Sequence, residues 1–349
     1  MTSPWRLTAD ADLRSRNTFG VAAHAPWLVE ISDENAVGEV LALPGLAGAA
    51  PLVLGGGSNL LFAGDAQVPV LVLDTYRIRI LEDDGATVIV RVDAGVEWHA
   101  LVLWTLRKGL MGLENLALIP GTVGAAPIQN IGAYGTEVGE FVRAVETWDR
   151  TAGAATRLDN ASCAFAYRDS VFKRAPDRHI VTAVEFALPR ERALKLDYAG
   201  IPEELQAMDV AAPTFADVAE AVIRIRTRKL PDPAVIGNAG SFFKNPIVPA
   251  ALAEELQQRH LGLPVFRGDA GDNRKISAAW MIEQAGWKGY REGDAGVAAT
   301  HALVLVNHGD ASGAQLLALA RRIAGSVRER FGVGIEPEPK IIGACWQPT

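Results

Sequence analysis

The sequence predicts an α+β protein of two domains. Its 349 residues correspond to roughly two domains of about 150 residues each. Residues 51–93 contain short β-branched runs separated by turn residues, which is typical of strands. Residues 214–228 and 312–331 carry apolar side chains at helical spacing. Directly after the first of these helices, residues 229–233 form a proline-rich break, which predicts a domain boundary.

The half of the chain before this break is expected to be rich in strands. Short apolar or alternating runs predict strands at residues 52–54, 70–74, 77–81, 86–93, 141–149 and 179–188. The run at 86–93 alternates apolar with charged side chains, as a half-buried strand does. Residues 98–106 then place apolar side chains on one helical face, and Gly109 is a typical helix stop.

The helix at residues 214–228 carries its own start signal, because Thr214 and Asp217 form a capping box. Beyond the break, the same spacing rules predict a helix, a strand, a long helix and a final strand, at residues 277–284, 302–307, 312–331 and 334–342. No internal repeat and no block of like charge interrupts this succession.

Composition and charge are those of an ordinary globular protein. Hydrophobic residues make up 49% of the chain and charged residues 21%. The net charge is −7, so no overall basic field exists to bind nucleic acid or an anionic membrane. No run approaches the ~20 apolar residues that span a bilayer, and residues 1–17 lack the apolar core of a secretion signal. We therefore expect no nucleic-acid partner, no membrane insertion and a cytoplasmic location.

The cysteines and histidines do not suggest a metal or disulfide scaffold. Cys163 and Cys345 form neither a disulfide framework nor a zinc-ligand set, and reduced thiols are expected. His301 and His308 lie near one predicted strand, but their spacing does not make a metal site. Each is interpreted as a lone polar contact, and no metal is expected.

The first glycine cluster follows an apolar strand and reads Gly55-Gly56-Gly57-Ser58-Asn59-Leu60. Glycines here allow consecutive backbone N–H groups to turn toward a diphosphate, because no Cβ obstructs the approach. The segment does not match the dinucleotide-binding fingerprint, and no GxxxxGK[ST] motif occurs in the chain. By itself the cluster fits either a cofactor-binding turn or a plain tight turn.

A second segment, residues 120–135, is rich in glycine and alanine with interleaved polar residues. It cannot form a core of its own, but it can wrap closely around a flat ligand and offer N–H and amide groups. A flexible loop is the alternative, although Ile128, Ile131 and Tyr134 argue against free solvation. Ligand binding is the favoured interpretation.

Ser241 follows Gly240 shortly after the proline-rich break. Gly240 permits an unusual backbone angle that would present the Ser241 hydroxyl in a cleft. No GxSxG elbow surrounds this serine, so a nucleophilic role lacks support. A positioned hydroxyl can instead give its proton to a developing carbanion. A structural turn residue is the alternative.

Two further charged residues are candidates for a site. Arg168 lies among aromatic residues, and its forked guanidinium suits a carboxylate; a surface ion pair with Asp169 is the alternative. Glu338 has proline on both sides, which suggests a strand edge or bulge that aims one carboxylate at a site. A solvated edge carboxylate is the alternative.

Taken together, these segments resemble the UDP-N-acetylenolpyruvoylglucosamine reductase family of flavoenzymes. Eight segments match in family order and extend over nearly the whole chain, at residues 17–20, 54–60, 119–124, 129–135, 167–170, 229–231, 240–246 and 336–338. One departure is Pro339, where the family usually has a non-proline apolar residue. Because proline lacks a backbone donor, the pairing of the last strand is in question there.

The resemblance implies a particular fold. It would be an FAD-binding α+β region of the vanillyl-alcohol-oxidase type, at residues 1–229, with subdomains at roughly 1–75 and 76–229. A smaller α+β substrate-binding domain would occupy residues 230–332. The C-terminal strand, within residues 333–349, would return to the first region. A monomer is expected.

The resemblance also implies an activity. In this family NADPH reduces non-covalently bound FAD, and the reduced flavin passes hydride to C3 of the enolpyruvyl ether of UDP-N-acetylglucosamine-enolpyruvate. The product is UDP-N-acetylmuramate, a peptidoglycan precursor. Ser241 matches the family's proton donor to C2. Arg168 and Glu338 match the catalytic groups that hold the substrate carboxylate and stabilise the enol-like intermediate, with Glu338 as a hydrogen-bond donor.

The matching segments assign binding residues as well. Those expected to bind FAD are Gly55, Gly56, Gly57, Ser58, Asn59, Leu60, Pro120, Gly121, Thr122, Val123, Gly124, Gln129, Asn130, Gly132, Ala133 and Tyr134. Those expected to bind the UDP-sugar are Tyr198, Lys229, Asn245 and His301. Tyr198 resembles the substrate-covering tyrosine loop of one subgroup, type I.

Two other functions remain open at this point. Another FAD-linked oxidase of the same superfamily is one, but such enzymes often tether the flavin through His or Cys, and neither glycine-rich segment contains either residue. A non-catalytic flavin or nucleotide sensor is the other. A sensor is expected to lose the catalytic residues, whereas Arg168, Ser241 and Glu338 are all present.

Overall fold

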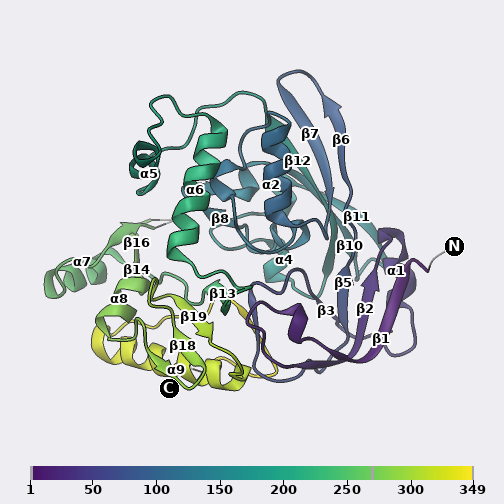
Figure 1. Cartoon of the computed structure of the whole chain (residues 1–349). Coiled ribbons are helices and arrows are strands. Elements are labelled where there is room, and N and C mark those ends of the chain that lie inside the picture. Colours follow the sequence, from purple (N-terminus) through teal and green to yellow (C-terminus); the bar gives the residue numbers. More distant parts are fainter. Residues whose placement is uncertain (1–2, 269–270, 348–349) are drawn as a thin grey trace. The chain divides into compact units, whose positions relative to one another are not determined.

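The computed structural model describes residues 3–268 and 271–347. The chain divides into two compact units, here called unit 1 and unit 2 (Figure 1). Unit 1 comprises Met1–Ala11, Ala25–Gly56 and Val68–Thr227, and unit 2 comprises Asp12–His24, Gly57–Gln67 and Arg228–Thr349. The division into a cofactor-binding region and a substrate-binding domain concerns function and stays a prediction.

A four-stranded sheet opens unit 1, in the order β1 (Trp5–Asp12), β2 (His24–Ile31), β5 (Val70–Leu73) and β3 (Leu52–Val53). The strands β2, β5 and β3 run parallel. Helix α1 (Val37–Leu41) buries Val37 and Val40 against the β-branched and leucine side chains of β2 and β5. The strands predicted at residues 52–54 and 70–74 are thus confirmed.

A five-stranded antiparallel sheet forms the second layer of unit 1. Its order is β11 (Ala154–Asp159), β10 (Val142–Asp149), β12 (His179–Pro189), β7 (Thr87–Asp93) and β6 (Ile78–Asp83). The strands predicted at 77–81, 86–93, 141–149 and 179–188 are confirmed within two residues at each end. Their β-branched side chains account for the long, regular ladders.

Helices α2 (Trp98–Arg107) and α6 (Phe215–Lys229) cover one face of this sheet (Figure 1). Thr214 and Asp217 form the predicted capping box, since the N–H of Thr214 donates to Asp217 Oδ2 at 2.8 Å and the N–H of Asp217 to Thr214 Oγ1 at 3.3 Å. The core between the two layers takes apolar side chains from strands and helices, among them Val90, Val184, Leu101 and Val222.

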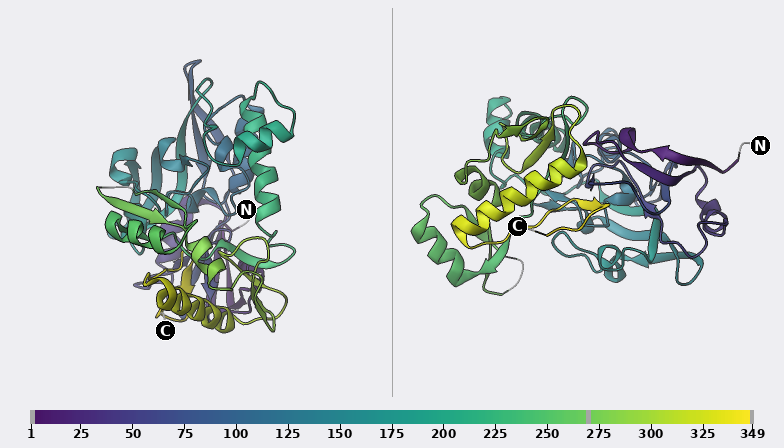
Figure 2. Two further views of the ribbon diagram at one scale, coloured as in Figure 1. Left: turned by 90° about the vertical axis from the view of Figure 1, so that its left-hand side faces the viewer. Right: turned by 90° about the horizontal axis from the view of Figure 1, so that it is seen from below.

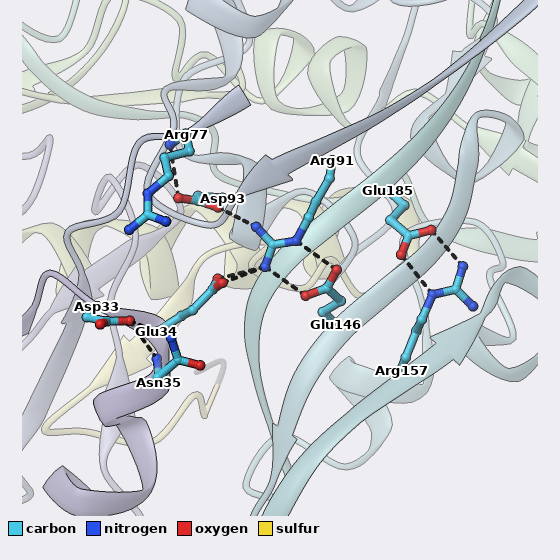
Figure 3. A network of polar contacts seen from close by, with 9 residues as sticks. All are labelled: Asp33, Glu34, Asn35, Arg77, Arg91, Asp93, Glu146, Arg157 and Glu185. Atoms are coloured by element: carbon cyan, nitrogen blue, oxygen red, sulfur yellow. Dashed lines mark hydrogen bonds and ion pairs between the residues drawn. The ribbon is translucent and has the colours of Figure 1, made fainter. Parts of the chain in front are cut away.

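The opposite face of the sheet carries a buried charge network (Figure 3). Arg91 is 6% exposed and donates to Asp93 at 2.6 Å, to Glu34 at 2.8 Å and to Glu146 at 2.7 Å. Burial disfavours its charge, but the hydrogen bonds to Glu146 and Glu34 raise its pKa overall. The prediction of a half-buried strand at 86–93 was therefore wrong: β7 is buried on both faces, because carboxylates from outside the strand cover its polar side.

Smaller elements complete unit 1. The strands β8 (Gly132–Ala133) and β9 (Thr136–Glu137) form a hairpin. The short helices are α3 (Asn160–Cys163), α4 (Val171–Arg174) and α5 (Ile201–Ala207), and the 3-10 turns are η2 (Glu34–Ala36), η3 (Glu114–Leu116), η4 (Val123–Ala125) and η5 (Val138–Glu140).

Unit 2 contains a sheet in the order β13 (Gly237–Ser241), β19 (Val304–Asn307), β18 (Ala295–Val297) and β17 (Arg291–Glu292). Helix α9 (Gly313–Phe331) packs on β18 and β19 and is the long yellow helix of Figure 2. A second sheet has the order β14 (Ile247–Pro249), β16 (Asn273–Ile276) and β15 (Val265–Arg267), beside α7 (Ala250–Arg259). Helix α8 (Ala278–Gln284) and turn η1 (Arg14–Arg16) are also part of unit 2. The helices predicted at 277–284 and 312–331 and the strand at 302–307 are confirmed.

The last predicted strand is only partly formed. Residues 334–342 were expected to be one strand, but only β20 (Lys340–Ile342) is regular, and it pairs in parallel with β4 (Leu60–Phe62). Before it, Pro337 forms a single bridge to Phe243. Pro337 and Pro339 have no N–H to donate, so a continuous ladder cannot form across them.

Two further observations concern the whole described chain. Among residues 3–268 and 271–347, no helix combines the length and the apolar character needed to cross a membrane. Cys163 is buried and Cys345 is exposed, and both are free thiols. Burial raises the pKa of Cys163 to about 12, so this thiol is inert.

Candidate active site

In unit 1 the two glycine-rich segments lie side by side. A Cβ on Gly56 would stand 3.0 Å from the Cα of Gly121, and a Cβ on Gly55 would stand 2.6 Å from Thr122 Oγ1. Gly121 also has a φ of +114°, which only glycine adopts readily. The backbones therefore approach as closely as glycine allows, and the structure brings together two segments that are 65 residues apart in sequence.

The backbone amides at this approach are available for a ligand. Within the described residues, the N–H groups of Gly55, Gly56, Gly121 and Thr122 donate to no protein acceptor. Gly55 and Gly56 are exposed and Gly121 and Thr122 are half-buried, so these amides can be reached by a ligand, and neighbouring amides without a protein partner favour an anionic oxygen. These residues thus fit a diphosphate cofactor such as FAD, which is held by donors and close backbone approach.

Val123 and Gly124, the next residues of the second segment, use their N–H groups within the protein. The N–H of Val123 donates to Val96 O at 2.8 Å, and that of Gly124 donates to Ala94 O at 2.9 Å. A Cβ on Gly124 would stand 2.6 Å from the Ala94 Cβ. These amides anchor the segment to the loop between β7 and α2. A cofactor role for Val123 and Gly124 stays a prediction, and it would have to use atoms other than these N–H groups.

The remainder of the first glycine segment belongs to unit 2. Gly57 has a φ of +63°, and a Cβ there would stand 2.1 Å from Arg16 O. The N–H of Thr18 donates to Gly57 O at 3.1 Å, so the 17–20 motif holds this turn. Asn59 O accepts from the N–H of Lys340 at 3.0 Å, next to the pairing of β4 with β20. Roles of Gly57, Ser58, Asn59 and Leu60 in binding FAD stay predictions.

The hairpin β8–β9 presents Tyr134 in unit 1. Tyr134 and Gly135 both have positive φ, +48° and +78°, which is the geometry of a type I′ turn. Asn115 Nδ2 donates to Tyr134 O at 3.1 Å, and the rings of Tyr134 and Tyr198 meet edge-on at 5.3 Å. Burial raises the pKa of the Tyr134 hydroxyl. Tyr198 itself is 51% exposed, on the loop before α5.

Asn130 stabilises the loop that precedes this hairpin. Its Nδ2 donates to Glu137 Oε2 at 2.7 Å and to Ala166 O at 3.1 Å, and its Oδ1 accepts from the N–H of Gly139 at 2.9 Å. Both side-chain donors are therefore used within unit 1. The cofactor contacts assigned to Asn130, and to its neighbours Gln129, Gly132 and Ala133, stay predictions.

Arg168 lies in a tight turn of unit 1. The N–H groups of Ala166 and Asp169 each donate to the other's carbonyl at 3.0 Å, and Arg168 between them has a φ of +53°. Its guanidinium lies 5.8 Å from the centre of the Tyr167 ring. The carboxylate of Asp169 pairs with Arg174. A non-glycine residue held at positive φ is strained, and such strain is common at functional sites.

In unit 2, Ser241 lies at a bulge at the end of β13. The register between β13 and β19 shifts between Asn238 and Ser241, and Gly240 within the shift has a φ of +66°. The Gly240 N–H donates to Asn238 Oδ1 at 3.0 Å, which fixes the bulge. Within the described residues, Ser241 Oγ has no protein hydrogen-bond partner. The hydroxyl is thus presented by a bent backbone, as the sequence predicts.

Glu338 belongs to a segment that pairs directly beside Ser241. The Glu338 N–H donates to Phe242 O at 2.8 Å, and the Lys244 N–H donates to Glu336 O at 3.0 Å. Because both flanking residues are prolines, the segment can donate only through Glu338 at this point. The structure therefore brings Glu338 and Ser241, 97 residues apart in sequence, onto neighbouring segments of unit 2.

Comparisons with known proteins agree with these observations. Residues 25–159 match the model of an FAD binding domain, and residues 232–342 match the model of the C-terminal domain of UDP-N-acetylenolpyruvoylglucosamine reductase. The reductase of Xylella fastidiosa (strain M12) is 57% identical, over 99% of this chain and 98% of that protein. The one of Xanthomonas axonopodis pv. citri (strain 306) is 58% identical, over 98% of each. The chain belongs to the UDP-N-acetylenolpyruvoylglucosamine reductase family.

The fold of this family is known from the crystal structure of UDP-N-acetylenolpyruvylglucosamine reductase of Thermus caldophilus. That structure matches with a TM-score of 0.68 and 26% identity, over 97% of this chain and 98% of that one. The predicted fold class, α+β with an FAD-binding region of the vanillyl-alcohol-oxidase type, is thereby confirmed. As a member of the family, the chain is a flavin-dependent oxidoreductase with FAD as its cofactor.

For this family member, unit 2 also groups the residues expected to bind the sugar nucleotide. His301 Nδ1 accepts the N–H of Leu303 at 3.2 Å. Burial lowers the pKa of His301, and the charges of Lys229 and Lys288 lower it further. Glu283 acts in the opposite direction and pairs with Lys288 at 3.0 Å, so Lys229 is the lysine near His301 that suits an anionic ligand. Asn245 Oδ1 accepts the N–H of Ala278 at 3.0 Å and so caps α8, which leaves its Nδ2 for other contacts.

The sequence interpretation missed several residues of these groups. Lys288 stands in Gly-Trp-Lys-Gly, a sequence without any spacing rule that indicates a site. Arg226 and His99 lie on helices whose apolar stripes alone were interpreted. No signal short of the fold itself would have selected them.

Proposed function

We propose that this protein reduces the enolpyruvyl ether of UDP-N-acetylglucosamine-enolpyruvate to UDP-N-acetylmuramate, with NADPH as the electron source, in the synthesis of peptidoglycan precursors. The observation that carries the proposal is the pairing of the Glu338 segment beside the Ser241 bulge, in a chain whose relatives at 57–58% identity are named as this reductase. An acid and a carboxyl group beside it are what protonation of an enol-like carbon requires.

When bound, FAD would supply the hydride for C3 of the enolpyruvyl group, with NADPH as the electron source. The chain's contribution to holding this cofactor is the set of unpaired amides at Gly55, Gly56, Gly121 and Thr122. No covalent tether is proposed, because the glycine-rich segments contain no His or Cys.

Ser241 delivers a proton to C2 of the substrate. Its hydroxyl is held at a bulge and is not occupied by another protein group within the described chain, so it can donate outward. Glu338 and Arg168 stabilise the negative charge that develops on the enol-like intermediate, Arg168 through its guanidinium charge. The strained turn at Arg168 supports this role, since the turn fixes where that cation is presented.

The sugar nucleotide binds through the remaining groups. Lys229, His301 and Lys288 take its diphosphate, and Asn245 Nδ2 and Tyr198 contact the rest of the molecule. The charges of Lys229 and Lys288 near His301 support the first assignment, with Lys288 shared with Glu283. The proposal further includes action as a monomer in the cytoplasm, where NADPH and nucleotide-activated sugars are found, with no partner besides substrate and NADPH.

Purified protein tests this function directly. We expect flavin to be released on acid precipitation, and NADPH oxidation to depend on added UDP-N-acetylglucosamine-enolpyruvate. Peroxide formation at the same rate without the sugar would identify an oxidase instead. Bound flavin without turnover on either substrate would identify a sensor. Light scattering of the same sample measures the oligomeric state.

A further inference from the structure

Arg226, on α6 of unit 1, has an unusual environment for a cation. It is partly buried, and its Nε donates to Leu118 O at 3.2 Å. Within the described chain this is its only protein hydrogen bond, and it forms no ion pair with a carboxylate. A guanidinium has five N–H donors, so the fork of its two terminal nitrogens remains to be satisfied. Among the described residues, no terminal nitrogen of Arg226 is a buried atom without a partner, so the fork is reachable from outside the protein and can bind an anion.

The groups around Arg226 also affect how easily its guanidinium carries a positive charge. Burial lowers its pKa, and the nearby charge of Arg168 lowers it further, whereas the Tyr134 hydroxyl raises it. Arg168 Nη1 lies 3.5 Å from where a Cβ on Gly132 would stand, directly before the turn that carries Tyr134. Two arginines from separate elements thus come to the same hairpin of unit 1, where Glu137 also lies close to Gly132, whereas the described residues give Arg226 no carboxylate of its own.

The position of Arg226 is fixed through Leu118. The N–H of Leu118 donates to His99 Nδ1 at 3.0 Å, while its carbonyl accepts from Arg226. Leu118 is held in this way at a φ of +57°. Burial lowers the pKa of His99, the charge of Glu97 raises it and that of Arg226 lowers it; the bond from Leu118 shows that Nδ1 is the unprotonated nitrogen. With Nε pinned to Leu118 O, the guanidinium has one orientation in which to offer its terminal fork.

We propose that Arg226 is a second anion-binding residue of the reaction, which places its terminal nitrogens on a delocalised anion of the bound cofactor or substrate beside Arg168. The inference deepens the proposed function and rests on it for the substrate. Two sources supply this chemistry: the pyrimidine edge of the flavin, which becomes anionic on reduction, and the carboxylate of the enolpyruvyl group. A forked cation suits either, because both spread one negative charge over two atoms.

The test compares holoenzyme of Arg226→Gln with Arg224→Gln. Arg224 lies on the same helix, is exposed, and in the described part of the chain pairs only with Glu220, so it is a matched control. The first arm uses no sugar and measures the midpoint potential of the bound flavin and the spectrum of its reduced form. The second arm titrates oxidised holoenzyme with UDP-N-acetylglucosamine-enolpyruvate and follows the flavin absorbance.

If the flavin is the source, Arg226→Gln binds reduced flavin at least ~10-fold more weakly relative to oxidised flavin, which corresponds to a potential about 30 mV lower. If the carboxylate is the source, the dissociation constant of the sugar nucleotide rises at least ~10-fold and the potential does not change. Either result supports the proposal. Values within twofold of Arg224→Gln in both arms overturn it.

Two additional measurements keep the result interpretable. If Arg226→Gln does not retain flavin, Arg226→Lys decides: it keeps the charge but loses the fork, and wild-type values for it in both arms overturn the proposal. If the wild-type protein fails to oxidise NADPH when the sugar is supplied, the proposed function falls. The first arm still tests Arg226 in that case, because it needs only the bound flavin.

Discussion

In unit 1 the candidate cofactor site consists mainly of backbone, whereas in unit 2 the candidate catalytic groups are side chains on paired segments. Gly55, Gly56 and Gly121 offer amides, and these can be close together only because no Cβ intervenes. Ser241 and Glu338 instead depend on a bulge and on two prolines that shape the chain around them. Cofactor binding should therefore be sensitive to an added Cβ in the glycine-rich segments and to the stability of unit 1. Proton delivery should instead be sensitive to the loss of a single side-chain group such as the Ser241 hydroxyl.

The largest effect is expected from the framework of unit 1. Arg91→Met leaves Glu34, Asp93 and Glu146 without their buried cation, and breaking a buried network in this way lowers the free energy of unfolding by about 3–5 kcal/mol. Urea unfolding of the holoenzyme measures the loss. Arg157→Met is the control, since Arg157 is half exposed and within the described residues pairs with a single carboxylate, that of Glu185. Equal losses for the two variants would show that the network has no special role.

Ser241→Ala tests the side-chain chemistry of unit 2. Reduction of the sugar should fall at least ~100-fold, the usual scale for a lost general acid. Flavin reduction by NADPH should continue, because Ser241 is not needed to hold the cofactor. Stopped-flow absorbance separates the two half-reactions. Unchanged turnover of the sugar would remove Ser241 from the mechanism, and Ser241→Cys, which keeps a proton donor, should retain more activity than Ser241→Ala.

Gly56→Ala tests the backbone contact of unit 1. The added Cβ would stand 3.0 Å from the Cα of Gly121, so the two segments must separate by a few tenths of an ångström. Overpacking of this kind costs about 1–3 kcal/mol, and we expect FAD affinity to fall by roughly tenfold or more. Gly334→Ala is the control, because a Cβ there meets nothing within 4 Å. FAD affinity equal to that of the control would contradict a backbone cradle at this place.

The smallest effect concerns pH. The pKa of His301 is lowered in the folded protein, mainly by burial, relative to an unfolded value of about 6.5. The unfolded state therefore binds the proton more readily, and the stability due to His301 is complete above that pH and declines as the pH falls below it. The urea midpoint of His301→Gln should decline less between pH 7 and pH 5 than that of the wild type. An identical decline would show that His301 does not contribute.

How far the sequence predicted the fold differs along the chain. Helices α2, α6, α8 and α9 lie close to where apolar spacing and caps placed them, because a helix makes its hydrogen bonds locally. The end of the chain was harder. A single strand was expected at residues 334–342, but strand pairing depends on a distant partner, and Pro337 and Pro339 cannot supply their share of the ladder.

The candidate site shows the same limit. The motifs around Gly55, Gly121 and Ser241 were visible as sequence because glycine clusters are unusual. Arg226, His99 and Lys288 were not, since an arginine, histidine or lysine in an ordinary helix or loop carries no pattern. The strand at 86–93 was similarly misjudged as half-buried, because its covering carboxylates, Glu34 and Glu146, come from elsewhere.

The sequence by itself determined the α+β class, the main helices, the family and the residue types available for chemistry, since these follow from local spacing and from motifs in order. The tertiary structure decided which of these residues meet. It placed Gly56 against Gly121 and Glu338 beside the Ser241 bulge, and among the described residues it gave Arg226 the carbonyl of Leu118 but no carboxylate. This proximity depends on contacts between segments far apart in the chain, and local sequence patterns do not determine such contacts.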